Sequence, residues 1–85
     1  MMKENRNDIQ QAIDEIYGEL LAVAADNNYL KASHPQTYRE TVIDEMTSLT
    51  LMAKQDPQIR DIFYSIGKEP DDALDVLLQK AIDTL

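Results

Sequence analysis

Apolar residues recur along this chain with the 3.6-residue period of an α-helix, and polar residues fill the positions between them. The pattern begins in residues 8–26, where a single stripe is formed by Ile9, Ile13, Ile16, Leu20, Val23 and Ala24. Spacings of three and four residues place these side chains on one face, with Tyr17 at its edge. We therefore predict a helix over 8–26. Asn7 is its expected N-cap in a capping box with Gln10, and Asn27-Asn28 is its expected left-handed stop.

Three prolines mark the starts of three more helices, at His34-Pro35, Asp56-Pro57 and Glu69-Pro70. Proline is favoured in the first turn, where its missing N–H breaks no helical hydrogen bond. We predict helices over 35–55, 57–66 and 70–84, with Asp56 capping the third helix and Gly67 following its end. The expected core faces are Tyr38, Val42, Met46, Leu49 and Ala53, then Ile59, Ile62, Phe63 and Ile66, then Leu74, Leu77, Leu78, Ala81, Ile82 and Leu85.

The connections between these helices are eight residues or fewer, which favours packing of neighbouring helices against one another. The sequence therefore predicts an all-α fold, a small four-helix bundle. At 85 residues we expect a single domain over 1–85, with residues 1–6 frayed. The chain has no Cys, no apolar run long enough to span a bilayer and no signal-peptide pattern. We expect a cytoplasmic protein, because secreted domains of this size often depend on disulfides.

The charge is strongly acidic, with 16 acids against 8 bases and a net charge of −8. Such a field repels phosphate backbones and anionic membranes and attracts basic protein surfaces. The last two helices could imitate a helix-turn-helix, but the residues that would enter the DNA groove are Asp71, Asp72 and Asp75. We therefore expect no direct nucleic-acid binding and no membrane binding, and a protein partner with a basic surface.

The residues that could carry catalysis or bind a metal are few and scattered. The only histidine, His34, precedes Pro35 in a predicted loop, and its neighbour Ser33 belongs to no nucleophile motif. No zinc or calcium ligand pattern and no glycine-rich phosphate loop is present. We predict no catalytic residues, no metal site, no cofactor and no enzyme activity.

Four acids of the first helix fall on one line, which we call the acidic line: Asp8, Glu15, Glu19 and Asp26. At about 100° per residue they lie within roughly 40° of one another, beside the apolar stripe. If the second helix returns antiparallel, Lys54 would approach Asp8 and Arg39 would approach Asp26. Glu15 and Glu19 would then remain unpaired, because the nearest residues of the second helix are Asp44 and Glu45. The acidic line is either a solvated face or a partner surface centred on Glu15 and Glu19.

Some apolar residues lie off the predicted core faces, among them Ile43, Leu51 and Val76. Several such residues on adjacent helices could form a patch, and a patch would favour a homo-oligomer, the simplest being a homodimer.

Three functional hypotheses follow. The first is a non-enzymatic protein-interaction module that binds a basic surface through the acidic line, as an inhibitor, immunity protein or adaptor does. The second is a structural homo-oligomer subunit that uses Ile43, Leu51 and Val76. The third is a DNA-mimicking antagonist of a nucleic-acid-binding protein, in which the acids of the first and last helices imitate phosphates. The chain resembles bacteriocin immunity proteins, phage-encoded inhibitors and antitoxins in size, charge and helix count alone, so no residue role carries over from them.

Overall fold

The computed structural model describes the backbone of residues 6–85 and the side chains of residues 9–85. Its helices are α1 (Arg6–Asp26), the short 3₁₀ helix η1 (Asn28–Leu30), α2 (Pro35–Gln55), α3 (Pro57–Ser65) and α4 (Pro70–Asp83). The chain is a small all-α four-helix bundle, as predicted. The predicted frayed segment 1–6 falls outside the described residues except for Arg6, which is the first residue of α1.

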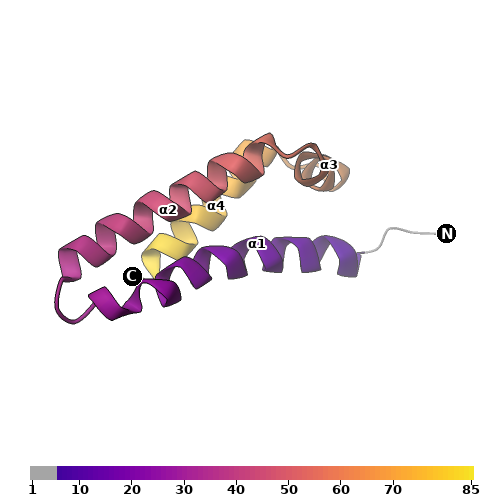
Figure 1. Ribbon diagram of the computed structural model, residues 1–85. Helices are drawn as coiled ribbons and strands as arrows, with labels where there is room; N and C mark the ends of the chain where they lie inside the picture. Colours follow the sequence, from indigo (N-terminus) through magenta and orange to yellow (C-terminus); the bar gives the residue numbers. More distant parts are fainter. Residues whose placement is uncertain (1–5) are drawn as a thin grey trace.

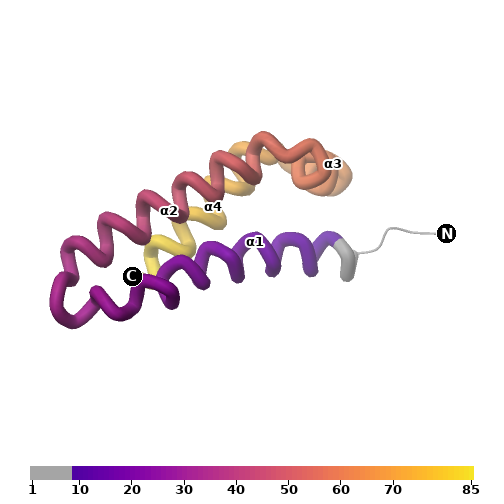
Figure 2. The backbone as a smooth tube through the Cα atoms, in the orientation of Figure 1, coloured from indigo at the N-terminus to yellow at the C-terminus, as the bar shows by residue number. Residues whose placement is uncertain are grey.

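The three long helices form the body of the bundle, and the short α3 lies across one end (Figure 1). α2 returns antiparallel to α1, and α4 runs back beside α2 toward the η1 end (Figure 2). α2 packs against α1, α3 and α4, and α1 also packs against α4. α2 is therefore the central helix of the fold.

The buried core has contributions from all four helices, and most of it comes from the predicted stripes. Its members are Leu20, Val23, Tyr38, Val42, Met46, Phe63, Leu74, Leu77 and Ala81. Burial of each of the larger side chains contributes about 1.5–3 kcal/mol, which is the main stabilising term available to so short a chain. Ile66 departs from the prediction: it is the C-cap residue of α3 and is 36% exposed.

Thr50 is buried in the core although it is polar. Its hydroxyl donates to the Met46 carbonyl oxygen one turn earlier at 2.9 Å, and Thr47 donates to the Ile43 carbonyl oxygen in the same way. These bonds satisfy the hydroxyls within the helix. Residues 46–51, which include threonines of high strand propensity, are helical throughout.

Both ends of α3 have the predicted caps. At its start, the Asp56 carboxylate accepts a hydrogen bond from the Gln58 N–H at 2.9 Å. At its end, Gly67 adopts a φ of 75°, and the N–H groups of Gly67 and Lys68 donate to the carbonyls of Tyr64 and Phe63. This is a Schellman motif, which requires a left-handed residue after the helix.

The predicted caps of α1 are wrong at both ends. The helix begins at Arg6, so Asn7 lies inside it, and the Gln10 side chain donates to Asp14 at 2.9 Å. At the other end, Asn27 has a φ of −99° and is not left-handed. Its buried side-chain amide instead donates to the Val23 carbonyl oxygen and to the Glu45 carboxylate of α2. Because the amide reaches α2, Asn27 ties the end of α1 to the central helix.

We predict that Leu74→Ala will lower the free energy of unfolding by about 2–5 kcal/mol, because Leu74 is fully buried and truncation leaves a cavity. The matched control is Leu51→Ala, at a leucine that is 52% exposed, and it should change stability by no more than about 0.5 kcal/mol. Urea denaturation followed by circular dichroism measures both. Equal losses in the two variants would contradict the described core.

The two glycines should respond to alanine with opposite signs. Gly67→Ala should destabilise the protein by about 1–2 kcal/mol, because a side chain strains the left-handed backbone there. Gly18→Ala lies in an exposed turn of α1 with nothing near the added methyl group, and it should stabilise by about 0.5–1 kcal/mol. Thermal denaturation of the two variants beside the natural protein provides the comparison. A stabilised Gly67→Ala would be inconsistent with the Schellman motif.

Candidate functional site

Glu15 and Glu19, the centre of the acidic line, lie at the edge of a pocket of about 430 Å³ that we call the acidic pocket. Both side chains are exposed. Neither forms an ion pair with any residue of the described part of the chain. The two carboxylates stand one turn apart on α1, where like charges repel one another. A cation from outside would relieve that repulsion.

The walls of the acidic pocket are apolar and come from three helices. α1 supplies Ile16 and Leu20, α2 supplies Leu49, Met52 and Ala53, and α3 supplies Ile59 and Ile62. Met52 is 65% exposed. Its flexible thioether can adapt to a ligand of varied shape.

Asp56 adds a third carboxylate to this pocket, from the junction of α2 and α3. The hydrogen bond from the Gln58 N–H fixes its position. No Lys, Arg or His lines the pocket. The acidic pocket therefore combines an apolar interior with a rim of one charge sign.

A second hollow of about 420 Å³, the seam pocket, lies along the same packing line between α1 and α2. It is lined by Val23 of α1 and by Asp44, Glu45, Ser48 and Leu49 of α2. Leu49 is common to both pockets. The acids of α2 that face the middle of the packing line thus continue the negative rim.

The remaining members of the acidic line are Asp8 and Asp26. The side chain of Asp8 lies outside the described residues. Asp26 is exposed and lines none of the pockets described here. The expected pair with Arg39 is wrong, since no ion pair joins these two residues.

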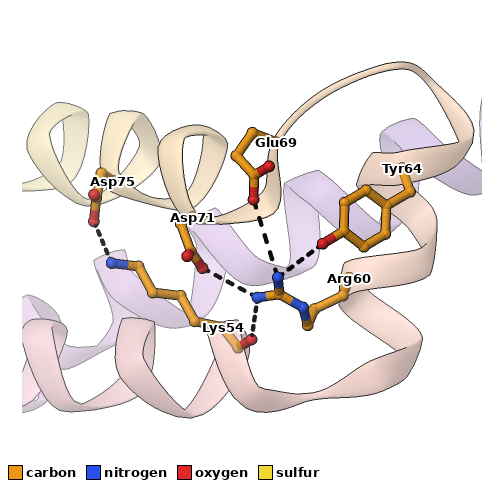
Figure 3. Close-up of polar contacts among 6 residues, drawn as sticks. All are labelled: Lys54, Arg60, Tyr64, Glu69, Asp71 and Asp75. Carbon is orange, nitrogen blue, oxygen red and sulfur yellow. Dashed lines mark hydrogen bonds and ion pairs between the residues drawn. The ribbon is translucent and has the colours of Figure 1, made fainter.

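Lys54 faces α4 rather than the acidic line, and its ammonium group lies 2.7 Å from the Asp75 carboxylate. The expected approach of Lys54 to Asp8 falls outside the described residues, because the side chain of Asp8 is not among them. Figure 3 shows the pair bridging the two helices. It is a partly exposed pair and contributes about 1 kcal/mol at most.

Arg60 holds α3, and with it one wall of the acidic pocket, against the rest of the bundle (Figure 3). Its guanidinium donates to the Lys54 carbonyl oxygen at 2.8 Å, to the Asp71 carboxylate at 3.1 Å and to the Tyr64 hydroxyl at 2.9 Å. Glu69 lies 4.0 Å away as a weaker ion pair. The bonds to Tyr64 and then to Asp71 raise the pKa of Arg60 above its ordinary value. Arg60 therefore stays charged at every ordinary pH.

Of the residues of the predicted oligomer interface, Ile43, Leu51 and Val76, only Val76 lines one of the three pockets. Val76 is 59% exposed and lines a third hollow of about 350 Å³ together with Ile13, Phe63, Lys68 and Asp72. We call it the α4 pocket. Leu51 is 52% exposed and Ile43 is half-buried, and neither lines any of the three pockets. The α4 pocket carries both charge signs, unlike the acidic pocket.

His34 and Ser33 lie in the exposed entry to α2, where the Ser33 hydroxyl is 2.9 Å from His34 Nδ1. A nucleophile and a base need an orienting group and a substrate cleft as well. Neither residue lines any of the three pockets. Across the described residues, no group of three or more His, Cys, Asp or Glu side chains is arranged to hold a metal ion. Residues 6–85 also contain no helix that is long and apolar enough to cross a membrane.

No protein-family model matches this chain, and neither the curated proteins nor the solved structures contain a match.

Sequence reasoning identified Glu15 and Glu19 but missed the pocket beside them. Met52 and Asp56 contribute to it, and the sequence showed Asp56 only as a helix cap. A usable signal was present, since residues 45, 49, 52 and 56 recur at spacings of four, three and four along one face. The hydrophobic periodicity of α2 does not predict that the short α3 closes one end of this face.

We predict that Arg60→Gln will loosen α3 while the rest of the bundle stays folded, because Arg60 joins α3 to the end of α2 and the start of α4. Hydrogen exchange followed by NMR should show faster exchange of the α3 amides than in the natural protein. Arg39→Gln is the matched control, since Arg39 is exposed and forms no ion pair with a described residue. Unchanged α3 exchange in Arg60→Gln would show that the caps and the buried Phe63 hold this helix without Arg60.

Proposed function

We propose that the protein is a non-enzymatic cytoplasmic interaction module that binds a basic surface of a partner protein, as an inhibitor, immunity protein or adaptor does. The observation that carries the proposal is the position of Glu15 and Glu19 at the edge of an apolar pocket lined by three acids and no base. Solvated acids need no adjoining pocket. An apolar depression with a charged rim is the usual composition of a protein-binding surface.

The internal ion pairs support this choice of surface. The bases at the junction of α2 and α3, Lys54 and Arg60, are bound to Asp75 and Asp71 of α4. The acids of α4 are thus partly neutralised, whereas those of the acidic pocket have no such partner among the described residues. A basic partner would meet uncompensated negative charge beside an apolar surface at Glu15 and Glu19.

The same pairs weigh against a DNA-mimicking antagonist, because two of the α4 acids that would imitate phosphates are already bound to bases. A homo-oligomer through Ile43, Leu51 and Val76 receives less support than the basic partner, because Ile43 is half-buried and only Leu51 and Val76 are well exposed.

The test compares two charge-reversed variants in capture from an extract of the source organism. Glu15→Lys/Glu19→Lys alters the acidic pocket, and Glu40→Lys/Asp83→Lys alters two exposed acids that line none of the three pockets. Each substitution adds two charges, so both variants move from −8 to −4. We expect specific partners to be retained by the control and lost by Glu15→Lys/Glu19→Lys, as quantified by mass spectrometry.

Capture should also weaken as salt is raised, since charges at the rim are screened over about 8 Å at physiological ionic strength. If both variants capture the same proteins as the natural chain, the surface around Glu15 and Glu19 is not the binding site.

A further inference from the structure

The acidic pocket and the seam pocket form one linear surface, which we call the acidic groove. Its α1 side runs from Ala12 to Val23 and its α2 side from Asp44 to Asp56. On an α-helix these stretches are about 16–18 Å long, which is about three helical turns. The groove is therefore long enough to hold a short segment of secondary structure.

The charge of the groove is of one sign along its whole length. Five acids line it, Glu15, Glu19, Asp44, Glu45 and Asp56, and no base does. Its interior is apolar and is lined by Ile16, Leu49 and Met52, with the buried Leu20 beneath them. A complementary occupant has an apolar face and positive charges on both flanks of that face.

A helix fits this description better than an extended strand. An extended segment in an apolar groove between helices would leave its backbone N–H and C=O groups without partners, because no strand edge is available among the described residues to pair with them. A helix satisfies its own backbone and presents apolar residues at i, i+3, i+4 and i+7 to a groove.

A second copy of this chain does not have the required charge. From Asp8 to Leu30 the chain carries no base, and α4 carries four acids against Lys80. Either helix would bring like charges to the groove, and neither α2 nor α3 has more bases than acids. The occupant is therefore a different protein.

We propose that the acidic groove binds a cationic amphipathic helix of about three turns from a partner protein. Its apolar face contacts Leu49 and Met52, and its flanking Lys and Arg side chains meet Glu15 and Glu19 on one side and Asp44 on the other. This inference rests on the proposed function, and it adds the secondary structure and the chemistry of the bound segment.

The test uses two synthetic peptides of about 14 residues with the same Leu and Lys composition. One has its leucines at helical spacing on one face, and the other has them distributed around the helix. Both carry a fluorescent label and are used at concentrations where sedimentation shows them to be monomeric. We expect fluorescence anisotropy to show at least roughly tenfold tighter binding of the amphipathic peptide to the full chain, a difference of about 1.4 kcal/mol.

Two neighbouring residues of α2 provide the matched variants. Met52→Lys places a positive charge in the groove. Leu51→Lys places the same charge on the preceding residue, which does not line the groove. Both side chains are more than half exposed, so both variants should fold. We expect Met52→Lys to weaken binding of the amphipathic peptide roughly tenfold and Leu51→Lys to leave it nearly unchanged.

Methyl NMR spectra locate the bound peptide. Shifts of Leu49, Ile59 and Ile62 would place it in the acidic groove, whereas shifts of Ile13 and Val76 would place it in the α4 pocket and overturn the inference. Equal affinity for the two peptides would also overturn it. So would a Met52→Lys variant that binds the amphipathic peptide as tightly as the natural protein does. In that case loss of capture by Glu15→Lys/Glu19→Lys would still support the proposed function, so the two failures are distinguishable.

Discussion

The central constraint on this fold is that three long helices share one small apolar core, in which Val42, Met46 and Leu74 are fully buried. A chain of this size has only that core with which to offset the entropy of ordering its backbone. α2 has to contact both α1 and α4 to complete it. The packing of α2 against α1 and α4 leaves part of the helix surface uncovered, and the position of α3 decides which part stays accessible.

The short third helix explains why the acidic groove stays open. α3 has 9 residues, about 14 Å of helix, whereas α1 and α2 have 21 residues each, about 32 Å. In a bundle of four equal helices, the third would cover the whole packing line between the first two. Here it lies across one end only, so that the flank of α1 and α2 toward η1 remains accessible. The basic side chains do not fill the opening, because Lys54 and Arg60 are directed to α4.

Helix periodicity and cap chemistry predicted the fold closely, and the errors have physical causes. The sequence predicts the helix starts and the turn after α3 because proline and glycine have strong local backbone preferences. These positions are Pro35, Pro57, Pro70 and Gly67. The left-handed conformation predicted for Asn27 is wrong because the Asn27 amide donates a hydrogen bond to Glu45 of α2. That tertiary hydrogen bond outweighs the local preference of Asn for the left-handed conformation. The candidate site was predictable only as an unpaired pair of acids on α1. Its apolar part depends on how three helices converge, which no single helical face reveals.

The cap on α3 and the Asn27 bond give the groove carboxylates unequal freedom. Asp56 is held by the Gln58 N–H and Glu45 by the Asn27 amide, whereas no ion pair restrains Glu15 or Glu19 within the described residues. Each restrained carboxylate keeps a free oxygen lone pair for a cation. Because the Asp56 and Glu45 side chains are already ordered, they lose little rotamer entropy when a ligand contacts them. Glu15 and Glu19 lose more, because they are free before contact. The groove therefore has fixed acceptors toward its two ends and adaptable ones between them, so that it can tolerate variation in the middle of a bound segment more readily than at its ends.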